Sequence, residues 1–149
     1  MKRFIPCTLS EDQRDLLQVT IKLIAVAGVS FSDKMLRGIV PDLTASGLGR
    51  QDHMDISVAI DSPEFARQVL AALPFVRALS RTKSMSRRRN VWSIAKELTA
   101  VTRSQVCTGA LVLALLSEGF TVERSRMGTG GSHANVSAPS VQIALKMLK

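Results

Sequence analysis

Residues 97–119, "ELTAVTRSQVCTGALVLALLSEG", decide the fold because they predict two helices in direct succession. Thr102 and Gln105 stand at the spacing of a capping box, so the second helix is expected to begin there and to cover residues 104–118. That helix is apolar on nearly every side, and such a helix has to be buried over most of its surface. A small monomer offers little room for this burial, whereas a dimer core offers more.

A strongly basic segment precedes these two helices. Residues 81–90, "RTKSMSRRRN", contain five Lys or Arg residues and no Asp or Glu. Asn90 is a suitable N-cap for the first helix, whose apolar residues recur in three-residue steps from Trp92 to Val101. The predicted order is therefore a basic extended segment, a helix, a tight turn and a buried helix.

This order resembles the ribbon-helix-helix family of bacterial DNA-binding regulators, over roughly residues 81–119. The positions that carry the resemblance are Glu97, Leu98, Thr102, Ser104, Gln105, Val106, Ala110, Leu111 and Leu115. In that family two chains pair their strands into an antiparallel ribbon that lies in the major groove of DNA, while their helices interlock. The resemblance implies an α+β, mainly helical homodimer that binds double-stranded DNA, as a transcriptional repressor or accessory factor.

The expected DNA-binding residues are basic or carry a hydroxyl group. They are Lys83, Ser84, Ser86, Arg87, Arg88, Arg89, Thr102, Arg103 and Ser104. In an extended segment Ser84, Ser86 and Arg88 share the face that would contact base edges, and the other three basic residues would bend toward phosphates. Backbone amides at a helix start near Thr102 would bind a further phosphate. The dimer core is expected to contain Val106, Ala110, Leu111 and Leu115.

Two alternatives remain open at the level of sequence. The ribbon has three candidate segments: residues 82–89, residues 3–9, where Pro6 favours an edge strand, and residues 54–61, which alternate strictly between apolar and polar. The second helix and the segment after it also resemble a winged helix-turn-helix. Residues 102–119 would then be the recognition helix and residues 121–137 the wing, with Arg124 and Arg126 near phosphate.

Elsewhere the chain shows several helix signals. Ser10 and Gln13 form a capping box that opens a helix over roughly residues 11–27, and Gly28 is a suitable stop. A short helix should follow Ser30 or Ser32 and end before Pro41. Ser62 and Pro63 begin another helix, which Pro74 is expected to break or kink, with residues 75–81 able to continue it for a turn or two. Two short strands around a Gly-rich turn and a terminal helix complete the chain.

The length of 149 residues and an apolar content of 46 % predict one globular domain. Charge divides it: residues 1–79 contain 9 Lys or Arg and 9 Asp or Glu, whereas residues 80–149 contain 11 and 3. We therefore expect a neutral half, a basic DNA-binding part over residues 80–119, and a hairpin with a terminal helix over residues 120–149. Such asymmetry indicates an acidic partner, most commonly nucleic acid.

Other functions have little support in the sequence. Two cysteines and two distant histidines give no metal or cofactor motif, and "GTGGS" lacks the glycine order of a nucleotide loop, so no enzyme is predicted. The chain has no Tyr and a single Trp, which disfavours a stacking platform for single-stranded nucleic acid. A cytoplasmic protein without a membrane segment is expected. The alternative function is a protein-protein interaction or scaffold module.

Overall fold

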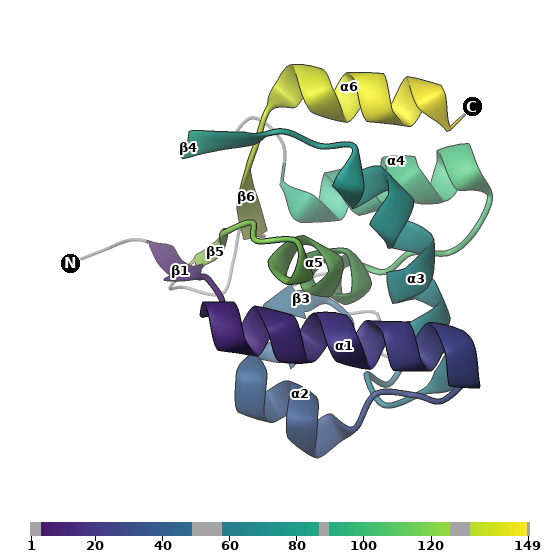
Figure 1. The fold of residues 1–149 in the computed structure, drawn as a ribbon. Helices are drawn as coiled ribbons and strands as arrows, with labels where there is room; N and C mark the ends of the chain where they lie inside the picture. Colours follow the sequence, from purple (N-terminus) through teal and green to yellow (C-terminus); the bar gives the residue numbers. More distant parts are fainter. Residues whose placement is uncertain (1–3, 49–57, 87–89, 126–131, 149) are drawn as a thin grey trace.

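The computed structural model describes residues 4–48, 58–86, 90–125 and 132–148, which form an α+β fold that is mainly helical (Figure 1). The helices in this described part are α1 (Glu11–Ala27), α2 (Asp33–Ile39), α3 (Pro63–Arg77), α4 (Val91–Thr102), α5 (Thr108–Ser117) and α6 (Ala138–Met147). The strands are β1 (Phe4–Cys7), β2 (Leu43–Thr44), β3 (Gly47–Leu48), β4 (Arg81–Ser86), β5 (Val122–Ser125) and β6 (Ser132–Val136). The predicted fold class is confirmed, and a ribbon-helix-helix dimer is not seen.

The larger sheet joins the two halves of the chain. Its strand order is β1-β5-β6-β4, with every pair antiparallel, so Phe4 lies opposite Ser125 and Glu123 lies opposite His133. The predicted strand before α1 therefore lies at one edge, as Pro6 indicated. The two strands predicted around the Gly-rich turn, β5 and β6, are confirmed. A separate two-stranded sheet pairs β2 with β3.

Serine side chains begin three of the helices as predicted. The capping box of α1 is complete, since Gln13 N–H donates to Ser10 Oγ and Ser10 N–H donates to Gln13 Oε1. Gly28 ends α1 in the left-handed conformation, at φ 69°. At the starts of α2 and α3, Ser32 Oγ accepts the Met35 N–H and Ser62 Oγ accepts the Phe65 N–H.

For the middle of the chain, one expectation is confirmed and another is corrected. The helix does continue past Pro74, and α3 ends at Arg77; Pro74 lies on its exposed side, where the carbonyl group it leaves unbonded can reach water. Residues 54–57 of the alternating segment lie outside the described residues. Its end, residues 58–61, is not a strand but a turn leading into α3, closed by the Ser62 N–H donating to Ala59 O.

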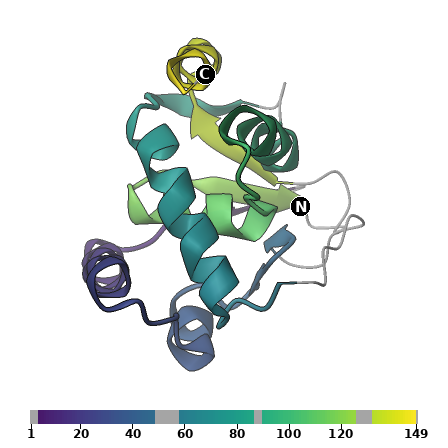
Figure 2. The same cartoon turned by 90° about the vertical axis from the view of Figure 1, so that its right-hand side faces the viewer.

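α5 occupies the centre of the molecule. All ten of its residues are buried, and it packs mainly on α3, with β3, α4 and α1 around the rest of its surface (Figures 1 and 2). Each of these neighbours presents an apolar face to α5, and the buried residues form one core that extends from Leu9 to Leu145. One chain therefore provides all the burial that this apolar helix requires.

Candidate nucleic-acid interface

The basic segment forms β4, an edge strand of the larger sheet. β4 pairs only with β6 among the described strands, and its register shifts between Arg81, opposite Val136, and Ser86, opposite Ala134. The candidate ribbon strand thus pairs within its own chain, as β1 also does. An irregular register with charged residues is typical of an edge strand that does not pair further.

Most side chains of β4 face solvent. Arg81, Thr82, Lys83 and Ser84 are exposed, and Met85 is half-buried. Ser84 and Lys83, expected on opposite faces, are both exposed, and the strand order places β4 at the edge of the sheet. Local bonds hold the strand in place: Arg81 Nη1 donates to Gly119 O at 3.3 Å and Thr82 Oγ1 donates to Ser84 O at 2.7 Å. The side chain of Ser86 and all of residues 87–89 lie outside the described structure.

Asn90 begins α4 as predicted, since Ser93 N–H donates to Asn90 Oδ1 at 2.7 Å. α4 starts close behind the basic strand, and its first turn contains no acidic residue. The positive end of the α4 dipole therefore lies next to the basic segment in the chain.

The phosphate site expected at Thr102, Arg103 and Ser104 is wrong. Thr102 is the last residue of α4, and Arg103 ends that helix in the left-handed conformation, at φ 58°. Thr102 Oγ1 donates back to Leu98 O at 2.8 Å and accepts the Ser104 N–H at 3.3 Å, so it caps no new helix. This is the negative, carbonyl end of α4, which repels a phosphate.

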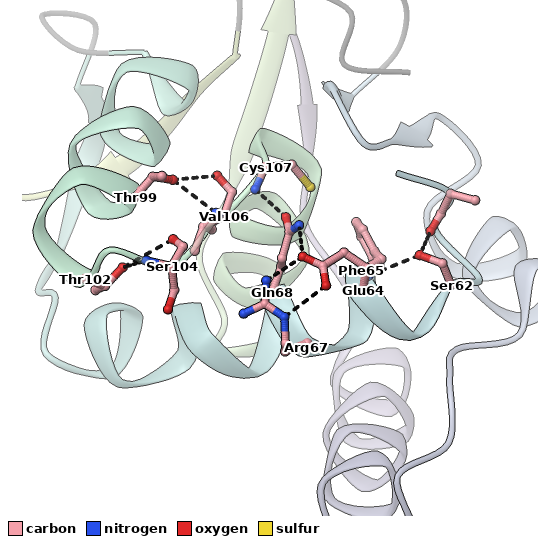
Figure 3. Close-up of polar contacts among 11 residues, drawn as sticks. Ser62, Glu64, Phe65, Arg67, Gln68, Thr99, Thr102, Ser104, Val106 and Cys107 are labelled. Atoms are coloured by element: carbon pink, nitrogen blue, oxygen red, sulfur yellow. Dashed lines mark hydrogen bonds and ion pairs between the residues drawn. The ribbon is translucent and has the colours of Figure 1, made fainter. Parts of the chain in front are cut away.

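α5 instead begins at Thr108, and a chain of hydrogen bonds fixes the connection before it (Figure 3). Thr99 Oγ1 accepts the Val106 N–H at 3.0 Å and donates to Val106 O at 3.3 Å. The Cys107 N–H donates to Oε1 of the fully buried Gln68 at 2.7 Å. Residues 106 and 107 are therefore held extended between α4 and α3, which delays the start of α5.

Glu64 anchors the other end of this chain of bonds. Gln68 Nε2 donates to Glu64 Oε1 at 3.0 Å, and the Arg67 guanidinium forms an ion pair with the same carboxylate (Figure 3). The hydrogen bond from Arg67, followed by the one from Gln68, lowers the pKa of Glu64 from its ordinary value of 4.5 to about 2. The orientation of Gln68, and with it the start of α5, depends on this exposed carboxylate.

The residues expected in a dimer core lie inside the single chain. Val106 is 2 % exposed, Leu115 is 1 % exposed, and Ala110 and Leu111 are fully buried. They already contact the helices around α5 and offer no surface to a second chain. The sequence argument for a dimer through these residues is therefore removed.

The charges of the described residues are distributed unevenly along the molecule. β4, α4 and α6 lie together at one end in both views, and α1 and α2 lie at the other (Figures 1 and 2). The first end carries Arg81, Lys83, Lys96 and Lys146 against the single acid Glu97. α1 and α2 together balance four acidic residues with four basic ones. Arg124 of the hairpin is already paired, with Asp42 at 3.2 Å, and Arg126 lies outside the described residues.

His133 and the two cysteines carry side chains that can titrate or act as nucleophiles. Strand pairing brings His133 Nδ1 to 4.0 Å from Glu123 Oε1, a neighbour that the sequence could not assign because it depends on the register of β5 and β6. The cysteines are both free, Cys107 is buried, and burial raises the pKa of the Cys7 thiol. The described residues contain no group of three or more side chains placed to hold a metal ion.

No family model, curated protein or solved structure matches this chain. Within the described ranges, none of the helices has the length and apolar character needed to cross a membrane.

Proposed function

We propose that this chain binds duplex DNA through a basic surface that includes β4 and Lys96. The observation that carries the proposal is the exposure of β4 within a stretch devoid of acids. Residues 65–96 contain eight Lys or Arg residues and no Asp or Glu. Exposed Arg81 and Lys83 lie in the middle of this stretch.

The chemistry of this surface suits a phosphate backbone. Arg and Lys neutralise phosphates, and the hydroxyl group of exposed Ser84 can donate to a phosphate or base oxygen. The three arginines at positions 87–89 extend the same run of charge in sequence. A two-stranded or single-strand edge of this kind fits the major groove, which admits β-structure as well as a helix.

The order of the elements also supports a nucleic-acid function. β4, α4, α5, β5 and β6 follow one another as in a winged helix-turn-helix, and β6 lies between β4 and β5 in the sheet. α5 stands where the recognition helix is expected, yet all its residues are buried. We therefore assign contact with DNA to β4 rather than to α5. The role we propose for the chain is that of a bacterial transcriptional repressor or accessory DNA-binding factor.

The proposal includes a homodimer, with a different interface from the one expected. Large exposed apolar side chains gather on α1, at Leu16, Val19, Leu23 and Val26. Their spacing of three, four and three residues is that of a coiled-coil seam, which favours another copy of the same helix as partner.

Fluorescence anisotropy of labelled duplex DNA at several salt concentrations tests the function. The Arg81→Ala/Lys83→Ala variant removes two cationic side chains that would contact phosphates. It should bind DNA more weakly, and the slope of log K against log salt concentration should become shallower by about 2. The matched control, Lys22→Ala/Lys34→Ala, removes the same charge from exposed positions on α1 and α2 and should change binding little.

The alternative, a protein-protein interaction module, predicts a different result. Binding of duplex DNA would then be absent, or equally weakened by both double variants, because only the total charge would matter. A third variant with residues 87–89 changed to alanine completes the comparison and measures how far the basic surface continues beyond β4.

A further inference from the structure

We propose that a cavity at the N-terminus of α5 binds a small oxyanion of the phosphate class. The cavity has a volume of about 200 Å³ and lies between the β2–β3 turn, α4 and the connection that leads into α5. Its walls include Ser46, Trp92, Lys96, Thr99 and Thr108. It is smaller than the roughly 300 to 1,000 Å³ of sites for drug-sized ligands, so it suits a single small group.

The backbone at the start of α5 presents hydrogen-bond donors to this cavity. Cys107 is the N-cap, but its side chain makes no capping bond, and the first turn of α5 contains no acidic residue. The N–H of Cys107 is bonded to Gln68, and that of Gly109 donates to Ala45 O at 2.9 Å. Within the described residues the Thr108 N–H has no acceptor. A helix start in this condition attracts an anion.

A hydroxyl group at the cavity wall provides a second and independent indication. Thr108 is only 7 % exposed and lines the cavity, yet its hydroxyl makes no hydrogen bond with any described part of the chain. The Thr108 methyl group faces Gly47, where Cγ2 lies 3.2 Å from the position of a Cβ, which leaves the hydroxyl for the cavity. The hydroxyl oxygen is not fully buried, so an anion in the cavity can reach it and accept its proton.

A cation completes the site. Lys96 Nζ lies 4.5 Å from the centre of the Trp92 ring, so a cation–π contact holds the ammonium group at the cavity wall. Among the described residues, those that line the cavity include no Asp or Glu. An ammonium group, a free backbone N–H and a free hydroxyl converge on one small space, which is the donor set that a phosphate group requires.

This site shares Lys96 with the proposed DNA surface but does not depend on β4. Two kinds of ligand could supply the phosphate group: a free phosphate or phosphate monoester, and a phosphate of a nucleic-acid backbone. Trp92 is the only tryptophan of the chain, so its fluorescence reports on the cavity directly.

The test is a titration of the folded protein with inorganic phosphate, followed by Trp92 fluorescence, with chloride at equal ionic strength as the reference. We expect a saturable change with phosphate alone. Thr108→Val keeps the shape of the side chain and should weaken phosphate binding about tenfold or more, because a hydrogen bond to a charged group is lost. Lys96→Met should weaken it further.

Two controls separate this site from the DNA surface and from misfolding. Urea unfolding should show that Thr108→Val is about as stable as the wild type without phosphate, since the Thr108 hydroxyl makes no hydrogen bond with the described part of the chain and is not fully buried. Arg81→Ala/Lys83→Ala should bind phosphate normally, so failure of the DNA proposal leaves this one intact. A duplex without terminal phosphate groups still carries backbone phosphates. If only this duplex changes the Trp92 fluorescence, and Thr108→Val weakens that change, the bound phosphate belongs to a nucleic-acid backbone. Absence of any saturable change, or equal affinity in wild type and Thr108→Val, would overturn the proposal.

Discussion

Gly109, the second residue of α5, lies against the backbone of Thr44 and Ala45 from the first half of the chain. A Cβ atom there would overlap the carbonyl group of Thr44, with the carbonyl carbon only 2.9 Å away. Because both sides of this contact are backbone, neither can move without displacing β2 or α5. Glycine is therefore required here by space rather than by conformation.

We predict that Gly109→Ala lowers the free energy of unfolding by about 1 to 3 kcal/mol, the usual cost of overpacking a core. Gly38→Ala is the matched control, since it makes the same change inside α2 with no atom within 4 Å of the new methyl group. Alanine should stabilise that helix by up to about 1 kcal/mol. Urea unfolding measures both, and a change of the same sign in the two variants would contradict the packing at Gly109.

Capping residues show what the sequence can and cannot predict at this scale. Ser10, Ser62 and Asn90 cap the helices they precede because the bonds they make are local. Thr102 has the same spacing to a glutamine, but its hydroxyl bonds back to Leu98. Which bond Thr102 makes depends on where the next helix begins, and that is decided by Gln68, which lies 39 positions before the Cys107 whose N–H it accepts.

At the scale of the element, the start of α3 is sensitive to pH through Glu64. Its pKa is lowered in the folded protein, so the ionised carboxylate stabilises the fold fully above pH 4.5, and this contribution is lost as the pH falls toward about 2. We predict that Glu64→Gln lowers the melting temperature at neutral pH. The difference from the wild type should shrink between pH 4.5 and about 2.

Thermal unfolding followed by circular dichroism over this pH range measures the effect. Glu11→Gln is the control, because Glu11 also lies in the first turn of a helix but forms no ion pair with the described residues. A difference between Glu64→Gln and wild type that stays constant down to pH 2 would show that the carboxylate charge is not what matters.

The helices themselves were largely predictable, and their neighbours were not. The sequence indicates that the second helix of the pair must be buried, since it is apolar all round, and α5 is. It does not indicate what buries it, because α1 and β3 come from the distant first half of the chain. Without knowledge that α1 and β3 cover this helix, sequence reasoning assigned its burial to a second chain in a dimer. The candidate DNA strand shows the same limit: its basic character is local, whereas its pairing with β6 is not.

At the scale of the whole molecule, the sheet order makes the two halves one structure. β1 from the neutral half pairs with β5, so the basic end and the balanced end share a single core. Charge asymmetry along the sequence therefore becomes asymmetry in space, with β4, α4 and α6 at one end (Figure 2). The two ends of the molecule therefore differ in electrostatic potential.

The apolar stripe on α1 lies away from that basic end, so self-association there would leave the DNA surface open. We predict that light scattering coupled to size exclusion shows a dimer for the wild type. Leu23→Lys should convert it to a monomer of 16.2 kDa, because a charge in a coiled-coil seam opposes pairing. Ile143→Lys on α6 is the matched control, since Leu23 and Ile143 are both 59 % exposed, and it should leave the dimer intact. A wild type that remains monomeric at every concentration would show that the homodimer prediction is wrong, while dissociation by Ile143→Lys alone would move the interface to α6.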